Sequence, residues 1–160
     1  MLTPSRSVPE AANLGFARPP LVYLGTIALG VMLHVARPVS LLPRGLNPGI
    51  GAVVVLLAIG LFLFAVRTFR AAGTPVPGNL PTTTIVATGP YRFSRNPIYL
   101  AFSLLQLGIA LWVNSLWLVL TLLVAVAIMS IVVIPREERY LEARFPSAYF
   151  PYKASVRRWL

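Results

Sequence analysis

The residues best suited to chemistry lie in two polar clusters of an otherwise apolar chain. The first is the stretch Thr88–Tyr99, T-G-P-Y-R-F-S-R-N-P-I-Y, which holds two arginines, two tyrosines and two prolines. The second is Arg136–Glu142, which contains three of the four acidic residues of the chain. Arginines and carboxylates at a membrane edge are costly unless they pair with each other or bind a ligand. The two clusters therefore indicate either a binding site or an ion-pair network, and the residues alone leave both interpretations open.

The composition excludes several classes of protein and of site. Of the 160 residues, 57% are hydrophobic and only 11% are charged, which is more apolar surface than a soluble domain of this size can bury. The chain has no cysteine and one histidine, His34, so we expect no thiolate nucleophile and no metal site. His34 is expected to be a packed or interfacial polar residue. A glycine-rich dinucleotide fingerprint, a P-loop, an H-E-x-x-H motif and a nucleophile elbow are all absent from the sequence.

Four apolar runs predict an all-α integral membrane protein with four transmembrane helices. The runs are Pro20–Ala36, Ile50–Val66, Ile98–Val113 and Leu116–Ile134. Only Asn114 and Ser115 separate the last two runs, which predicts a tight helical hairpin. Trp112 and Trp117 flank this turn, where aromatic residues of the membrane interface are expected. Pro135 is expected to end the fourth helix.

The basic residues predict the orientation of these helices. Twelve of them fall on one side of the predicted spans: Arg6, Arg18, Arg67, Arg70, Arg92, Arg95, Arg136, Arg139, Arg144, Lys153, Arg157 and Arg158. The other side has only Arg37 and Arg44, so both termini are expected in the cytoplasm. The net charge is +10, but the basic residues flank the apolar runs and do not form a single stripe. This distribution favours anionic lipid headgroups as partners and argues against nucleic acid.

This topology divides the chain into three parts. Residues 1–19 form a cytoplasmic lead-in, residues 20–134 form the transmembrane domain with a cytoplasmic loop at 67–97, and residues 135–160 form a C-terminal cytoplasmic tail. In the tail, aromatic and apolar residues recur every three or four positions, at Tyr149, Tyr152, Val156 and Trp159. With the interleaved basic residues, this spacing predicts a helix that lies in the membrane interface.

The hairpin also predicts which polar residues meet. Because its two helices share a cytoplasmic end, Arg95 and Tyr99 are expected beside Glu137 and Glu138. The alternative interpretations are structural, and four of them stay open. In the first, the arginines and glutamates form an ion-pair network and bind no ligand; in the second, Pro90 and Pro97 only shape the turn. In the third, a set of tyrosines belongs to the aromatic belt of the membrane interface: Tyr91, Tyr99, Tyr149 and Tyr152. In the fourth, Arg92 contacts a lipid phosphate.

Both clusters resemble one family. G-P-Y-R-F-S-R-N-P-I-Y resembles the G-P-Y-R-x-x-R-H-P-x-Y signature of the isoprenylcysteine carboxyl methyltransferase and phospholipid methyltransferase superfamily. The segment E-E-R-Y-L-E-A-R-F-P-S-A-Y-F-P-Y-K-A-S-V-R-R resembles the E-E-x-x-L-x-x-x-F-G-x-x-Y-x-x-Y-x-x-x-V-x-R tail of the same superfamily. The resemblance covers roughly Pro75–Leu160. Asn96 stands where the family most often has histidine, and Pro146 where it usually has glycine.

The resemblance implies an integral-membrane methyltransferase that uses S-adenosylmethionine as its cofactor. The residues it places in the cofactor pocket, which the C-terminal tail completes, are Gly89, Pro90, Tyr91, Arg95, Asn96, Pro97, Tyr99, Glu137 and Glu138. Arg95 and Glu138 would be the catalytic residues. Arg95 suits the cofactor carboxylate, either glutamate suits its ammonium or ribose hydroxyls, and a tyrosine face suits the sulfonium or adenine. Asn96 cannot titrate near neutral pH, which argues against a base at that position.

The acceptor of the methyl group stays open at this stage. A lipophilic or small amphiphilic carboxylate, amine or thiol is expected, and it would enter from the bilayer. One alternative is a sterol or steroid reductase that uses NADPH, although such enzymes carry N-Y-x-G-E where this chain has P-I-Y-L-A at residues 97–101. Another alternative is a membrane scaffold without catalytic activity, which would leave the Arg95 and Glu138 clusters without a purpose.

Overall fold

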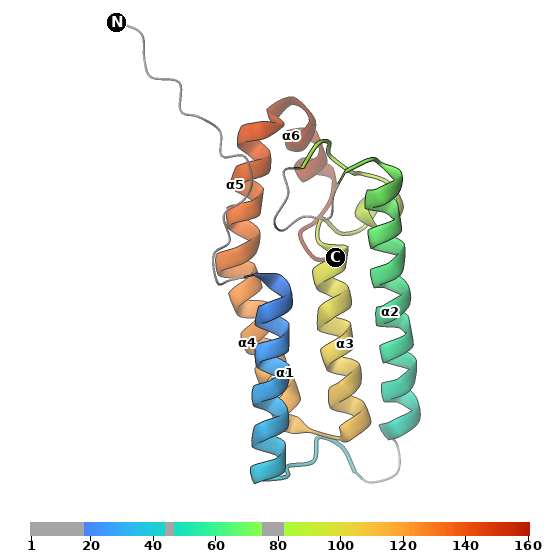
Figure 1. Cartoon of the computed structure of the whole chain (residues 1–160), viewed down its shortest axis with the longest axis vertical. Coiled ribbons are helices and arrows are strands. Elements are labelled where there is room, and N and C mark those ends of the chain that lie inside the picture. Colours follow the sequence, from blue (N-terminus) through green and yellow to red (C-terminus); the bar gives the residue numbers. More distant parts are fainter. Residues whose placement is uncertain (1–17, 44–46, 75–81) are drawn as a thin grey trace, which may run out of the picture.

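The computed structural model describes residues 18–43, 47–74 and 82–160, and every regular element in these ranges is helical (Figure 1). The elements are α1 (Pro19–Ala36), α2 (Asn47–Ala71), the 3₁₀ turn η1 (Gly89–Arg92), α3 (Pro97–Val113), α4 (Leu116–Ile128), the π-helical turn η2 (Met129–Val133), α5 (Ile134–Arg144) and α6 (Pro146–Ser155). Of the lead-in predicted at residues 1–19, all but Arg18 and Pro19 lies outside the described residues.

Three of the described helices are long and apolar enough to cross a membrane: Pro19–Ala36, Gly49–Ala71 and Leu116–Arg144. The apolar helix α3 is shorter, with 17 residues. Large apolar side chains such as Leu24 on α1 and Leu123 on α4 are exposed on the outer faces of the bundle. Contiguous apolar surface of this extent indicates contact with lipid.

The second helix is longer than the sequence predicted. We assigned Arg37–Gly49 and the start of 67–97 to loops, but α2 begins at Asn47 and continues to Ala71. Proline is tolerated in the first turn of a helix, where its missing N–H has no intrahelical partner, and arginine is a good helix former. The helix is followed by Gly73 in the left-handed region, with φ of 67°.

The prediction that Pro135 ends the fourth helix is wrong. Helical structure continues from Leu116 to Arg144 as one rod, and the π turn Met129–Val133 lies directly before the proline. Proline lacks an N–H and clashes with the carbonyl one turn earlier, and a π turn changes the hydrogen-bond pattern at that place. The rod therefore carries Glu137 and Glu138 beyond the apolar part of the helix.

The helices pack as two close pairs, α2 with α3 and α1 with α4 (Figure 1). α3 runs down to the turn that joins it to α4, and α4 runs back up from this turn (Figure 1). Although the two helices are consecutive, α3 packs more extensively on α2 than on α4. Asn114 adopts the left-handed conformation, and its side chain bonds to the backbone of Leu41 and Leu42. Small residues allow the close pairing, because a Cβ on Gly51 would lie 2.4 Å from the backbone nitrogen of Trp112.

Adding one methyl group at Gly51 is expected to destabilise the protein. The Cβ of Gly51→Ala would clash with the backbone of α3, so the two helices must separate. We expect this to lower the free energy of unfolding by roughly 1–3 kcal/mol. Gly60→Ala in the same helix meets no atom within 4 Å and gains helix propensity. Thermal unfolding in lipid nanodiscs measures the difference. A melting temperature for Gly51→Ala equal to that of Gly60→Ala would contradict this packing.

The C-terminal tail is only partly the predicted interfacial helix. α5 ends at Arg144 and α6 begins at Pro146, but α6 stops at Ser155. Val156 is extended, with φ of −123° and ψ of 134°, so the predicted helical repeat through Trp159 is wrong. The reason is tertiary: the carbonyl of Arg157 accepts a hydrogen bond from the backbone N–H of Arg95, 3.0 Å away. The chain end therefore returns to the start of α3 (Figure 1).

Candidate functional site

A pocket lies where the end of α2, the turn η1, the start of α3, α5 and α6 meet. Its lining combines aromatic, apolar and charged side chains: Phe69, Thr82, Thr84, Ile85, Val86, Tyr91, Arg95, Asn96, Pro97, Ile98, Tyr99, Glu137, Glu138, Tyr140, Leu141, Tyr149 and Tyr152. A mostly apolar cavity with a few convergent polar groups is the usual form of a small-molecule site.

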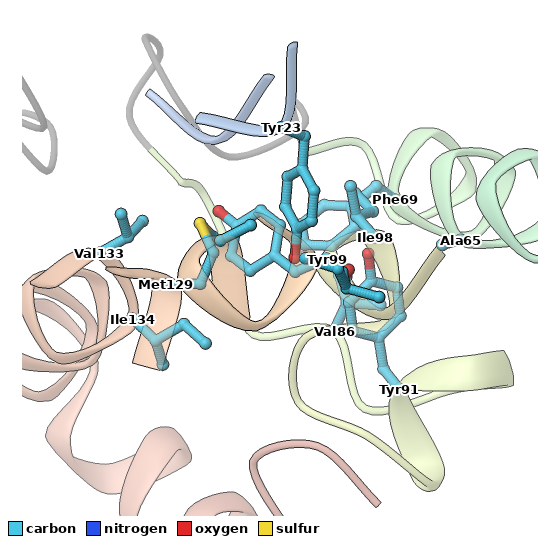
Figure 2. Packing of buried hydrophobic residues seen from close by; sticks show 12 residues of the cluster. Tyr23, Ala65, Phe69, Val86, Tyr91, Ile98, Tyr99, Met129, Val133 and Ile134 are labelled. Atoms are coloured by element: carbon cyan, nitrogen blue, oxygen red, sulfur yellow. The ribbon is translucent and has the colours of Figure 1, made fainter. Parts of the chain in front are cut away.

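Local backbone geometry brings the first motif to this pocket. Gly89 has φ of 56°, and a Cβ there would lie 2.8 Å from Thr68 Oγ1, so glycine permits the turn to approach α2 closely. The turn then buries Tyr91, whose ring packs edge-to-face on Phe69 with centroids 4.8 Å apart. Figure 2 shows Tyr91 and Tyr99 in one cluster with Phe69 and Tyr23. Pro97 opens α3 and thereby directs Tyr99 toward α5.

The charged centre of the pocket is Glu138, which is only 6% exposed. Arg95 Nη2 lies 3.1 Å from its Oε1. Arg158 binds the same carboxylate in a bidentate fork, in which Nε donates to Oε1 at 3.1 Å and Nη2 donates to Oε2 at 2.8 Å. The remaining nitrogens of Arg95, Nε and Nη1, are buried and have no hydrogen-bond partner in the described part of the chain. A guanidinium with two buried donors unsatisfied is costly, which indicates an acceptor that belongs in this pocket.

A second polar pair lies beside it. Tyr99 Oη donates a hydrogen bond to Glu137 Oε1 at 2.5 Å, and both residues are buried. The backbone oxygen of Tyr99 accepts from Tyr23 Oη at 3.2 Å and from Ser103 Oγ at 3.0 Å, which ties α1 to α3. The predicted juxtaposition of Arg95 and Tyr99 with the two glutamates is therefore confirmed as geometry. Its role in binding stays a prediction.

Four tyrosines form most of the aromatic wall. The interpretation of Tyr91, Tyr99, Tyr149 and Tyr152 as membrane-belt residues is wrong, because each is less than 10% exposed and lines the pocket. Burial raises the pKa of Tyr149 to about 12 and raises the pKa values of Tyr91 and Tyr152 further above their usual range, so these phenols are neutral at physiological pH. Tyr152 donates to the backbone oxygen of Tyr91 at 2.9 Å, whereas Tyr91 Oη is buried without a partner.

The other residues of the first motif have structural contacts. Gly89 and Pro90 do not line the pocket: Gly89 packs on α2, and the carbonyl of Pro90 accepts from the backbone of Phe93 and Ser94. Asn96 reaches the rim, where its Nδ2 donates to the backbone oxygen of Arg158 at 3.0 Å. Arg92 is exposed and stays outside the pocket, as its interpretation as a lipid-phosphate contact requires.

The sequence reasoning missed part of the lining. Phe69 lies at the end of α2, and Thr82, Thr84, Ile85 and Val86 lie in the connection that precedes the motif. This connection is held over the pocket by Arg144, whose Nε donates to the backbone oxygen of Thr82 at 3.2 Å. The aromatic spacing of Tyr149 and Tyr152 was a signal that we read as lipid contact. Arg158 matches the arginine that ends the tail signature of the family, but we predicted no role for it in the site.

Comparisons with known proteins identify the family of this chain. A sequence model of the family described as phospholipid methyltransferase matches residues 47–148, well over half of the chain. A curated protein of Haemophilus influenzae, described as an uncharacterized protein, is 36% identical over 63 residues, which make up 39% of this chain and 100% of that relative. No solved structure matches the chain. The match includes the first motif, both glutamates and α2, whose end supplies Phe69. The chain belongs to the phospholipid methyltransferase family.

Proposed function

We propose that this integral-membrane methyltransferase takes its methyl group from S-adenosylmethionine and transfers it to a lipophilic or small amphiphilic acceptor. The observation that carries the proposal is the buried guanidinium of Arg95, whose Nε and Nη1 lack partners within the described part of the chain and lie in a pocket of aromatic side chains. Such a group is suited to a ligand carboxylate, to which either free nitrogen can donate a charge-assisted hydrogen bond.

The residues present fit the groups of this cofactor. The free nitrogens of Arg95 would hold the carboxylate, and Glu137, whose Oε1 already accepts from Tyr99, would accept from the ammonium or the ribose hydroxyls. The faces of the buried tyrosines Tyr91 and Tyr149 suit the sulfonium or the adenine, since aromatic rings attract cations and stack on bases. The unpartnered Tyr91 Oη is a further donor for a polar ligand atom.

When bound, S-adenosylmethionine would supply an electrophilic methyl group on a sulfonium cation. The chain would contribute orientation and exclusion of water, and the structure favours both. Arg95 is fixed by Glu138, and Tyr99 by Glu137, so the polar contacts are held in place before binding. The apolar wall of Phe69, Val86 and Ile98 keeps the pocket poor in water, which strengthens the electrostatic contacts within it.

We further propose four membrane spans, with α3 and α4 as a hairpin and both termini in the cytoplasm. The 17 residues of α3 correspond to about 26 Å of helix, near the lower limit for a span. Exposed arginines at the pocket end of the bundle, including Arg67, Arg70 and Arg139, support this side as the cytoplasmic one, facing anionic lipid headgroups. The acceptor would then reach the pocket from the bilayer.

Because the chain has no cysteine, single-cysteine labelling can test on which side of the membrane each terminus lies.

Binding of the cofactor tests the proposal. The purified chain in lipid nanodiscs is titrated with S-adenosylmethionine in a calorimeter, and NADPH is titrated in parallel. We expect saturable binding of S-adenosylmethionine and none of NADPH. Heat only with NADPH would instead favour a reductase, and no heat with either would favour a scaffold without a cofactor. Thermal stabilisation by each compound is an independent check, since a ligand that binds the native state raises its melting temperature.

A further inference from the structure

We propose that Arg158 is a positioning residue that holds Glu138 so that Nε and Nη1 of Arg95 stay available to a ligand in the pocket. The inference rests on the proposed function, because it concerns the contact of Arg95 with a ligand carboxylate. Arg158 itself does not line the pocket. Its action would pass through Glu138, which lies between the two arginines.

The two arginines share Glu138 unequally. Arg158 engages both carboxylate oxygens, at 3.1 and 2.8 Å, whereas Arg95 uses only Nη2, at 3.1 Å from Oε1. A carboxylate accepts a planar guanidinium best as a fork of two parallel bonds. Since Arg158 occupies that position, Arg95 is limited to a single contact. Among the residues that the structure describes, its Nε and Nη1 therefore have no acceptor and stay available to a ligand.

Charge balance leads to the same conclusion. If Glu138 faced Arg95 alone, the pair would be neutral and a ligand carboxylate would gain little from approaching it. With Arg158 added, the group of three carries one net positive charge. Because the side chains of Arg95 and Glu138 are only 9% and 8% exposed, electrostatic attraction beside them is stronger than in water. Lys153 adds little, because its Nζ lies 4.0 Å from Glu138 Oε2 but 2.6 Å from Glu142 Oε1.

The backbone around Arg158 holds the same region in place. The carbonyl of Arg157 accepts from the backbone N–H of Arg95 at 3.0 Å, and the carbonyl of Arg158 accepts from Asn96 Nδ2, also at 3.0 Å. Trp159 Nε1 donates to Ser130 Oγ at 3.2 Å, which anchors the segment on the π turn. The extended segment after α6 therefore fixes Arg95 at both its backbone and its side chain.

The test compares Arg158→Gln with Arg139→Gln in the full chain in nanodiscs. Arg139 is the exposed neighbour of Glu138 on α5 and has no part in the pocket. Each variant is titrated with S-adenosylmethionine and with its decarboxylated form, which lacks only the carboxylate that Arg95 would bind. We expect Arg158→Gln to lower the affinity for S-adenosylmethionine about tenfold, which corresponds to the loss of one charge-assisted contact. Its affinity for the decarboxylated form should fall by less than about twofold. Arg139→Gln should change neither.

The outcomes separate this inference from the proposed function. If Arg158→Gln lowers the affinity for both compounds equally, or lowers neither, while the unaltered chain binds S-adenosylmethionine, the positioning role of Arg158 is overturned. Absence of binding by the unaltered chain would overturn the proposed function and this inference with it. If Arg158→Gln does not fold, Arg158→Lys decides, because lysine keeps the charge but loses the fork. A selective loss of about threefold supports the inference, and affinities equal to those of the unaltered chain contradict it.

Discussion

Replacing Arg95 by glutamine is expected to reduce the affinity for S-adenosylmethionine at least about a hundredfold and to abolish methyl transfer. The variant removes a largely buried cation whose Nε and Nη1 are donors without a partner in the described part of the chain. Glutamine can offer one neutral hydrogen bond in their place. Glu138 keeps its two contacts with Arg158, so the fold should persist and the loss should appear in binding. Titration calorimetry in nanodiscs measures the dissociation constant.

Arg92→Gln is the matched control for this prediction. It removes the same charge from the same motif, but Arg92 is exposed and lies outside the pocket. Its affinity for the cofactor should stay within about twofold of that of the unaltered chain, as for most exposed charges. Equal losses in the two variants would show that general positive charge, and not the buried edge of Arg95, attracts the ligand.

The second large effect is expected from Glu138→Gln. Glutamine leaves Arg95 buried beside Arg158 with no counter-charge, and breaking a buried ion pair costs about 3–5 kcal/mol. The lower end of that range, about 3 kcal/mol, applies here because Arg158 keeps 36% of its side chain exposed and stays partly hydrated. The variant should therefore unfold at a lower temperature and bind the cofactor poorly. Thermal unfolding followed by circular dichroism measures the first effect.

Glu142→Gln controls for the loss of a glutamate from the same helix. Glu142 pairs with Lys153 at 2.6 Å, but both side chains are more exposed, so this pair should contribute less than about 1 kcal/mol. We expect its melting temperature and its cofactor affinity to be close to those of the unaltered chain. A Glu138→Gln variant as stable as Glu142→Gln would contradict the view that Glu138 organises the two arginines.

Much of the site could be predicted because apolar runs and loop lengths limit where its residues lie. The short turn at Asn114 and Ser115 requires the start of α3 and the end of the following rod to lie at the same end of the bundle. Arg95 and Glu138 therefore had to be neighbours, and the structure places them 3.1 Å apart. The family motifs predicted the same residues for the site, and residues 47–148, which the family model matches, include them. Their role in binding stays a prediction.

The rest depended on tertiary contacts that the sequence does not display. Pro135 predicts a helix end locally, but the π turn before it allows the helix to continue. Tyr149 and Tyr152 show the spacing of an interfacial helix, yet α6 folds over the pocket and buries them. Arg158 belongs to a basic run that is solvated in most proteins, and only the extended end of the tail brings it to Glu138. Aromatic and basic patterns do not distinguish a lipid surface from a pocket wall.

The most direct test of the central claim is methyl transfer itself. Membranes from cells that express the chain, or its Arg95→Gln variant, are incubated with S-adenosylmethionine labelled in the methyl group, and the label in extracted lipids and small amphiphiles is counted. We predict labelled product with the unaltered chain and none above background with Arg95→Gln. Label that is absent from both, or equal in both, would contradict a methyltransferase site built around Arg95.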